Sequence, residues 1–322
     1  MLTKSDLERV QQLVYQYMQP TPAYAWPLLC EAAGCEVWVK HENHTPIGAF
    51  KVRGGLVYLD ELMRQDGPSH LVTATRGNHG QSIPFAARQY QCAVDVFVPE
   101  GNSVEKNAAM RAWGARLHVH GCDFDEAARQ AERFAEQNQA HRIPSFDEHL
   151  VRGVATCGAE LFAGVADLDT VYVPVGMGSG ACAMVWVRDL LGFKTDIVGV
   201  VAAGADAFAQ SFDAGRVTPG AHAATFADGI ATRLPHPDAF AILAQGLARV
   251  VTVTDTQIAD AMRLLYHTTH NIAEGAGAAA TAALLAELAD GRDPGKVAVV
   301  LTGGNIDQDV FAAVLSGATP AV

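Results

Sequence analysis

Short runs rich in β-branched residues alternate along this chain with longer stretches of helical periodicity. The predicted strands lie at residues 37–39, 71–73, 94–98, 117–119, 171–173, 197–201, 250–253 and 297–301. Predicted helices at residues 123–137, 256–267 and 276–288 separate some of these strands. This alternation predicts an α/β fold with two parallel-rich open sheets that carry helices on both faces. In such a fold, functional groups lie in the loops that follow the carboxyl ends of the strands.

The N-terminal segment predicts a helix rather than a targeting signal. Ser5 and Glu8 have the spacing of a capping box, and Leu7, Val10 and Val14 lie on one helical face. No apolar signal core follows the first residues, so we expect a cytoplasmic protein.

The six cysteines include no pair with the two-residue spacing of redox or zinc motifs, and we expect them to be reduced thiols.

The composition indicates a large globular protein. With 322 residues, of which 49% are hydrophobic, the chain can bury a core that is large enough for two domains. The 23 Lys and Arg residues against 35 Asp and Glu residues give a formal net charge of −12. This charge opposes binding to nucleic acids and anionic membranes. The uncharged stretch 170–187 contains Pro174 and several glycines, which predict a strand, a loop and a helix start rather than a membrane span.

Three motifs together predict a cofactor. Lys51 follows Phe50 among small residues, where an extended segment becomes a helix. A glycine-rich loop, Gly176–Gly180, follows one apolar strand, and Thr302 follows another. A lysine that can form a Schiff base, a glycine nest for a phosphate and a hydroxyl at a strand end are the groups that pyridoxal phosphate needs.

These motifs, together with Arg76–Gln81 and Glu274–Gly277, resemble the threonine dehydratase and serine racemase group of fold-type II pyridoxal-phosphate enzymes. The resemblance extends from about Thr21 to Asp307. It implies a large cofactor-binding domain made of residues 1–51 and 143–322. A small inserted domain would comprise residues 52–142, without the C-terminal regulatory domain of biosynthetic threonine dehydratases. We also expect a homodimer.

The resemblance assigns Lys51 as the catalytic lysine and Phe50 as the residue that packs on the cofactor ring. The phosphate would be held by Gly176, Met177, Gly178, Ser179 and Gly180, where Met177 and Ser179 replace glycines that are common in relatives. A dinucleotide-binding loop is the competing interpretation of this glycine cluster, but such loops belong to the first βα turn of a domain. Lys51 could otherwise be a solvated lysine at a helix start.

Further cofactor contacts follow from the same resemblance. Asn78 would hydrogen-bond the 3′-oxygen of the cofactor, although it could simply occupy a turn. Thr302 would face the pyridine nitrogen, although it could merely cap a strand end. A hydroxyl at that place makes the cofactor a weaker electron sink than a carboxylate would, which suits β-elimination. Gly229 and Glu274 would line the cofactor.

The substrate is expected to bind along Thr75–His79, where Thr75, Gly77 and Asn78 would hold its α-carboxylate. His79 is expected to be a structural histidine without a chemical role. Racemases of this group carry a serine that returns a proton at the position of Arg76, and an arginine stays charged and exchanges protons poorly. Arg76 would bind a substrate carboxylate or pair with a neighbouring acid, and both interpretations stay open.

No metal site is predicted. His41, Glu42 and His44 are residue types that bind metals, but they occupy a segment that we expect to be extended, where successive side chains diverge. In metal-binding relatives, a Glu and an Asp follow the strand after the phosphate loop. Both are absent by alignment, although Asp206 is adjacent.

The sequence therefore predicts a pyridoxal-phosphate ammonia-lyase that acts on a β-hydroxy α-amino acid. Threonine or serine is the default substrate, and a larger side chain, as in 3-phenylserine, or an acidic one, as in 3-hydroxyaspartate, stays open. The alternatives are an amino-acid racemase of the same fold and a catalytically silent amino-acid-binding protein.

Overall fold

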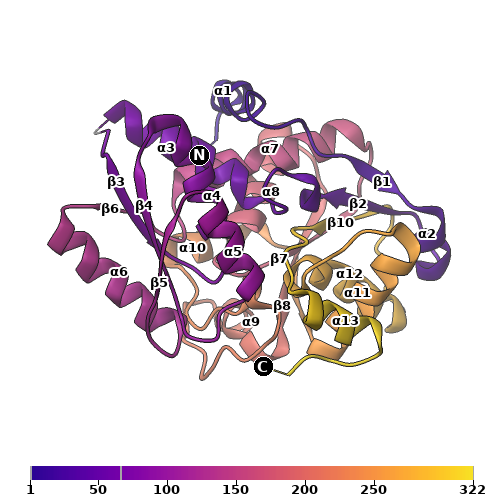
Figure 1. Cartoon of the computed structure of the whole chain (residues 1–322). Coiled ribbons are helices and arrows are strands. Elements are labelled where there is room, and N and C mark those ends of the chain that lie inside the picture. Colours follow the sequence, from indigo (N-terminus) through magenta and orange to yellow (C-terminus); the bar gives the residue numbers. More distant parts are fainter. Residues whose placement is uncertain (1, 66, 322) are drawn as a thin grey trace.

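The computed structural model describes residues 2–65 and 67–321, which form two β-sheets with surrounding helices (Figure 1). The larger sheet has six strands in the order β1-β2-β10-β7-β8-β9. The smaller sheet has four strands in the order β5-β4-β3-β6. Every neighbouring pair is parallel except β1 and β2, which are antiparallel. The α/β fold predicted from the alternation is thus confirmed.

The six-stranded sheet consists of β1 (Ala23–Ala25), β2 (Val37–His41), β7 (Thr170–Pro174), β8 (Asp196–Ala202), β9 (Arg249–Val253) and β10 (Val297–Leu301). The four-stranded sheet consists of β3 (His70–Ala74), β4 (Ala93–Val98), β5 (Arg116–Val119) and β6 (His141–Arg142). All strands predicted from β-branched runs are present. The sequence missed β1 and β6, since three and two residues are too short to show a β pattern.

The α-helices are α1 (Lys4–Val14), α2 (Pro27–Ala33), α3 (Lys51–Gln65), α4 (Asn78–Ala87), α5 (Val104–Ala112), α6 (Phe124–Asn138), α7 (Glu148–Gly164), α8 (Ser179–Leu191), α9 (Ala207–Ala214), α10 (Pro237–Gly246), α11 (Asp255–Thr269), α12 (Gly275–Ala289) and α13 (Gln308–Leu315). Short 3₁₀ helices are η1 (Glu42–His44), η2 (Arg88–Tyr90), η3 (Ala203–Ala205) and η4 (Asp228–Ile230). The predicted helices correspond to α6, α11 and α12. Among the described residues, no helix is both long and apolar enough to cross a membrane.

Helices cover both faces of each sheet. On the larger sheet, Val171 and Val173 pack into one apolar cluster with α7, α8 and α10, while Tyr172 packs into another with α2, α11 and α12. This division follows from the alternation of side chains along a strand. On the smaller sheet, the small residues of α6 pack against β3 and β4, and α4 and α5 contact the sheet from its other side (Figure 1).

The predicted capping box at Ser5 and Glu8 is wrong. Thr3 is the N-cap of α1, and its hydroxyl accepts a hydrogen bond from the Asp6 N–H at 3.1 Å, while the Asp6 carboxylate accepts one from the Thr3 N–H. Thr3 and Asp6 have the same three-residue spacing as Ser5 and Glu8, so the helix begins one residue before Ser5. The predicted apolar face of Leu7, Val10 and Val14 is buried.

The four-stranded sheet lies within residues 70–142, inside the segment 52–142 that the family resemblance assigns to a small domain. Helix α3 starts that segment and contacts both α4 and α7. The division into residues 1–51 with 143–322 and residues 52–142 stays a proposal.

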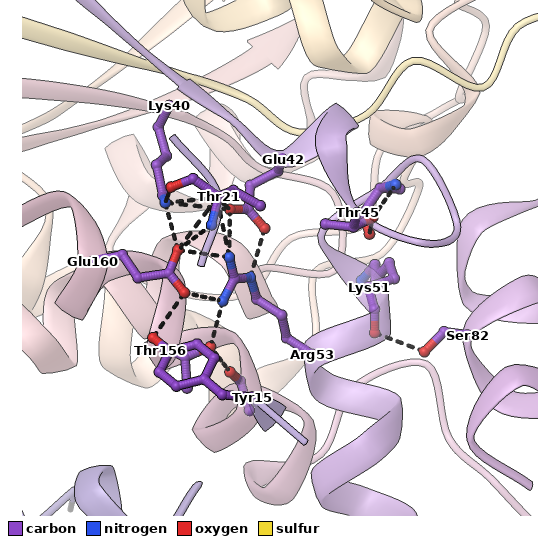
Figure 2. Close-up of polar contacts among 12 residues, drawn as sticks. Tyr15, Thr21, Lys40, Glu42, Thr45, Lys51, Arg53, Ser82, Thr156 and Glu160 are labelled. Atoms are coloured by element: carbon purple, nitrogen blue, oxygen red, sulfur yellow. Dashed lines mark hydrogen bonds and ion pairs between the residues drawn. The ribbon is translucent and has the colours of Figure 1, made fainter. Parts of the chain in front are cut away.

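A buried network of charges connects β2, α3 and α7 (Figure 2). The guanidinium of Arg53 donates to Glu42 from Nε at 2.7 Å and to Glu160 from Nη1 at 2.6 Å. Lys40 Nζ donates to Glu160 at 2.5 Å and to the carbonyl of Thr21 at 2.6 Å. The side chains of Lys40, Glu42 and Arg53 have no solvent exposure. Two cations and two carboxylates thus neutralise each other, which such burial requires.

Removal of Arg53 should be strongly destabilising, because it leaves buried carboxylates without their main partner. We expect Arg53→Met to lower the free energy of unfolding by about 3–5 kcal/mol at neutral pH. The matched control is Arg64→Met, since the Arg64 side chain is 56% exposed beside Asp60 and its loss should cost at most about 1 kcal/mol. Chemical unfolding followed by circular dichroism measures the free energy of unfolding of both variants. Equal decreases in the two variants would contradict a stabilising role of the buried network.

The decrease in the free energy of unfolding caused by Arg53→Met should depend on pH. Burial alone would raise the pKa of Glu42, but Arg53 and Lys40 hold it at about 2. A lowered folded-state pKa means that the stabilisation is present above the ordinary carboxyl pKa and is lost as pH falls toward 2. Without Arg53 the pKa of Glu42 rises, and protonation then relieves the unpaired charge. The stability difference between Arg53→Met and the parent protein should therefore shrink between pH 7 and pH 4.

Candidate active site

One cavity of about 550 Å³ contains every site residue that the sequence predicted. Most of these residues come from loops and helix starts after β3, β7 and β10 and from the start of α3, while Gly229 lies in η4 and Glu274 is the N-cap of α12. They are Phe50, Lys51, Thr75, Arg76, Gly77, Asn78, His79, Gly176, Met177, Gly178, Ser179, Gly180, Gly229, Glu274 and Thr302. The parallel strand ends thus bring together residues from positions far apart in the chain, as expected for an open α/β sheet.

Lys51 is the first residue of α3 and points at the start of α8. Its Nζ donates a hydrogen bond to Ser179 Oγ at 3.0 Å and lies 4.8 Å from the centre of the Phe50 ring. Burial lowers the pKa of Lys51 to about 8. A larger fraction of the side chain is therefore the uncharged amine at neutral pH than for a lysine in water, and the uncharged amine is the nucleophile and base.

The backbone around Lys51 is held on both sides. The hydroxyl of Ser82 donates to the Lys51 carbonyl at 2.7 Å (Figure 2), and the Phe50 N–H donates to the Thr302 carbonyl at 3.0 Å. Arg53 of the buried network lies on the same first turn of α3. These contacts set the direction in which the Lys51 side chain leaves the helix.

The glycine-rich loop forms an anion cradle at the N-terminus of α8. Gly178 is the N-cap with a φ of 97°, and no side chain caps this helix, so its first N–H groups are free for a ligand. A Cβ on Gly176 would lie 2.5 Å from the Gly229 carbonyl oxygen, and one on Gly180 would lie 3.6 Å from the Phe50 ring. The loop therefore approaches Gly229 too closely for a larger residue at position 176, whereas the distance from Gly180 to the Phe50 ring is an ordinary van der Waals contact.

A chain of polar contacts crosses the cavity from Asn78. Its Nδ2 donates to Glu274 Oε1 at 2.6 Å, and Asn305 Nδ2 donates to Asn78 Oδ1 at 2.8 Å. Glu274 pairs with Lys106 at 2.9 Å, and Lys106 also pairs with Asp228 at 2.7 Å. Burial raises the pKa of Glu274. Burial alone would lower the pKa of Lys106, but Asp228 and Glu274 raise it.

The sequence patterns do not indicate Lys106, Asp228 or Asn305. Lys106 lies in the first turn of α5, where a lysine normally faces water, and it is only 5% exposed here. Asp228 directly precedes the predicted Gly229, and Asn305 lies three residues after the predicted Thr302. The loop positions were the available signal, since nothing in the linear sequence pairs Lys106 with acids more than 100 residues away.

The segment Thr75–His79 connects β3 to α4 and has mostly internal contacts. Thr75 Oγ1 accepts from the Gly77 N–H at 2.9 Å and from the Gly80 N–H at 3.3 Å. A Cβ on Gly77 would lie 2.5 Å from Lys106 Cδ, so this close approach requires glycine. His79 is 7% exposed, and burial together with Lys51 lowers its pKa to about 3. Its Nε2 has no hydrogen-bond partner among the described residues.

The segment that the sequence places before Lys51 is not extended throughout. β2 ends at His41, and η1 (Glu42–His44) stacks the rings of His41 and His44 with centroids 4.8 Å apart. The prediction that these side chains diverge is therefore wrong for the two histidines. Glu42 does diverge, because it turns into the buried network with Arg53.

The residues of the cavity fit pyridoxal phosphate. A lysine with a lowered pKa lies beside an aromatic ring, and the uncapped start of α8 with its close-packed glycines suits a phosphate. Thr302 is 6% exposed, and its hydroxyl has no hydrogen-bond partner among the described residues, so it is available to a ligand. The His79 ring nitrogen, which also lines the cavity, has no partner among the described residues either.

The chain is similar to known proteins in sequence. The family model described as pyridoxal-phosphate dependent enzyme matches residues 14–303. The chain is 30% identical over 318 residues to the L-threonine ammonia-lyase of Thermotoga maritima, covering 98% of this chain and 79% of that protein. It is 29% identical over 296 residues to the biosynthetic L-threonine dehydratase of Haemophilus influenzae, covering 91% of this chain and 58% of that protein.

A solved structure agrees along the whole length. The processed form of threonine deaminase isoform 2 from Solanum lycopersicum has a TM-score of 0.88 with this chain at 26% identity. The match covers 98% of this chain and 95% of that one. The extent of the family match, together with a cavity that contains the lysine, the glycine nest and the strand-end hydroxyl, shows that this chain belongs to the pyridoxal-phosphate dependent enzyme family.

Proposed function

We propose that this enzyme is an ammonia-lyase that converts an L-β-hydroxy α-amino acid into a 2-keto acid and ammonia. The observation that carries this proposal is the position of the Lys51 amine, which lies between the Phe50 ring and the start of α8 in the same cavity as Thr75–His79. Relatives named threonine ammonia-lyase and threonine deaminase support the reaction class.

The residues have distinct proposed roles. Lys51 binds the cofactor through its amine and, once displaced by the substrate amine, removes the α-proton. Gly176–Gly180 hold the phosphate, Asn78 contacts the 3′-oxygen, Thr302 contacts the ring nitrogen, and Phe50, Gly229 and Glu274 line the ring. Bound pyridoxal phosphate supplies the electron sink that makes the α-proton acidic.

The proposed reaction needs no reagent other than the substrate and water. The α C–H bond loses its proton to Lys51, and the Cβ–O bond breaks with its electron pair on oxygen. The departing hydroxyl takes up a proton and leaves as water. Water then hydrolyses the released enamine to a 2-keto acid and ammonia. The substrate therefore undergoes no net oxidation.

Substrate orientation is proposed to depend on the start of α4. The N–H groups of Asn78 and His79 have no acceptor among the described residues. The Thr75 hydroxyl accepts hydrogen bonds from the Gly77 and Gly80 N–H groups but donates none to a described residue. These donors can hold an α-carboxylate at a helix N-terminus. The Gly77 N–H is already bonded to Thr75, so the glycine serves the close approach of Lys106 instead.

An amino-acid racemase is the second candidate, because the same fold serves that reaction. We further propose that the enzyme works in the cytoplasm as a homodimer, without nucleic-acid or membrane partners. The excess of acidic residues supports the last point.

Lys51→Ala should abolish both turnover and the visible absorbance of the bound cofactor, because it removes the amine that forms the Schiff base. Lys194→Ala is the matched control, since Lys194 is exposed and does not line the cavity. Absorbance spectra and keto-acid release from L-serine and L-threonine measure both properties. A Lys51→Ala protein that kept them would overturn the assignment.

Gly176→Ala should weaken cofactor binding about tenfold or more, because the new methyl group would meet the Gly229 carbonyl and displace the cradle. Gly164→Ala is the control, because a Cβ there meets no atom within 4 Å. Fluorescence titration of the cofactor-free proteins with pyridoxal phosphate measures the affinity. Equal affinities of the two variants would remove Gly176 from the cradle.

The enzyme should eliminate without appreciable racemisation. By the family resemblance, Arg76 occupies the position of the proton-returning serine of racemases, and a guanidinium exchanges protons poorly. Chiral chromatography of L-serine or L-threonine reactions, run beside a keto-acid assay, measures both reactions. Formation of the α-epimer at a rate comparable to elimination would support the racemase instead.

A further inference from the structure

Arg76 is a charged side chain of the cavity without a partner. It lies between the end of β3 and the Gly77 N-cap of α4, is partly buried and lines the cavity. No residue that the structure describes forms a hydrogen bond or ion pair with it. A partly buried guanidinium without a counter-charge loses hydration and gains nothing in return. A ligand that supplies an anion would satisfy it.

The other cations that line the cavity are already engaged. Lys106 pairs with Asp228 and Glu274, Arg233 pairs with Asp125, and Lys51 is bonded to Ser179. Among the lysines and arginines that line the described cavity, Arg76 is therefore the one without a partner.

The acids of the cavity are engaged as well. Asp228 and Glu274 face Lys106, Asp125 faces Arg233, and Asp123 caps α6 by accepting from the Glu126 N–H. Pairing of Arg76 with a neighbouring acid was one of the two interpretations open from the sequence. The described contacts show no such pair, which favours the interpretation in which Arg76 binds a substrate carboxylate.

That carboxylate need not be the α-carboxylate. The proposed α-carboxylate donors are the Thr75 hydroxyl and the first N–H groups of α4, and these are sufficient without a guanidinium. The phosphate cradle lies at the start of α8, which follows a strand of the other sheet. Neither the α-carboxylate nor the cofactor phosphate therefore needs Arg76 as a partner. The remaining place for an anion in the proposed reaction is the substrate side chain.

We propose that the preferred substrate carries a second carboxylate on its side chain, with 3-hydroxyaspartate as the simplest compound of this class, and that Arg76 binds this carboxylate. This inference rests on the proposed ammonia-lyase function. The reaction loses the α-proton and the β-hydroxyl as water, and hydrolysis of the enamine then gives a four-carbon 2-keto dicarboxylate and ammonia. Arg76 acts as a specificity residue and takes no part in proton transfer.

The first experiment compares 3-hydroxyaspartate, serine, threonine and 3-phenylserine as substrates of the holoenzyme. A charge-assisted contact predicts a kcat/KM for 3-hydroxyaspartate about 10- to 100-fold above that for serine. Arg76→Ala should lower kcat/KM for 3-hydroxyaspartate at least about tenfold more than kcat/KM for serine, mainly through KM. Arg76→Lys should keep part of the preference, because it keeps the charge but loses the planar fork.

The matched control is Arg111→Ala, which removes an exposed arginine that does not line the cavity. It should leave the ratio of the two kcat/KM values unchanged. Preference of the parent enzyme for serine, threonine or 3-phenylserine would overturn the inference. An unchanged ratio in Arg76→Ala would also overturn it.

A second experiment does not depend on turnover. Succinate has two carboxylates but cannot react, so it should raise the melting temperature of the holoenzyme, whereas butyrate at the same ionic strength should not. The succinate effect should disappear in Arg76→Ala and persist in Arg111→Ala. Absence of a succinate effect in the parent enzyme would reject the anion site.

The two experiments separate the two proposals. If none of the β-hydroxy amino acids released a keto acid, the ammonia-lyase function would fail, and the succinate measurement would still decide on Arg76. If serine were deaminated without any preference for the dicarboxylate, the function would stand and the role of Arg76 would fail.

Discussion

The buried pairing of Arg53 with Glu42 and Glu160 is the interaction on which the site depends. It joins η1, the first turn of α3 and the C-terminal part of α7, and Glu160 lies more than 100 residues from the other two in the sequence. Charged groups are stable without water only when partners surround them, so the network tolerates little displacement. Because Lys51 lies two residues before Arg53, the same pairing holds the helix turn from which the reactive amine projects.

A second set of contacts joins the start of α5 to η4, to the start of α12 and to Asp307. Lys106 at the start of α5 reaches Asp228 and Glu274, and Asp307 accepts from the Ser103 hydroxyl and the Val104 N–H at the N-terminus of α5. An aspartate at a helix N-terminus is stabilised by the helix dipole. The charged groups of Lys106, Asp228 and Glu274 are therefore paired with one another. Arg76 differs from them because no described residue pairs with it.

Much of the fold could be predicted from local chemistry. Short runs of β-branched residues are enough to mark the strands that the sequence predicts. β1 and β6 have no such run and depend on pairing with their neighbours. At the start of α1 the pattern is present but ambiguous, because Thr3 with Asp6 and Ser5 with Glu8 have the same spacing. Only the backbone geometry decides which pair caps the helix.

For the site, the sequence by itself determined the residue types: a lysine at a helix start, glycines where no Cβ fits, and a threonine at a strand end. Each of these is a local requirement, so its signature remains in the chain. The tertiary structure alone decided that Lys106 is buried between two acids and that Arg76 has no counter-charge among the described residues. Partnership between charges depends on distances of a few ångströms between residues far apart in sequence, and the linear order of the residues does not contain those distances.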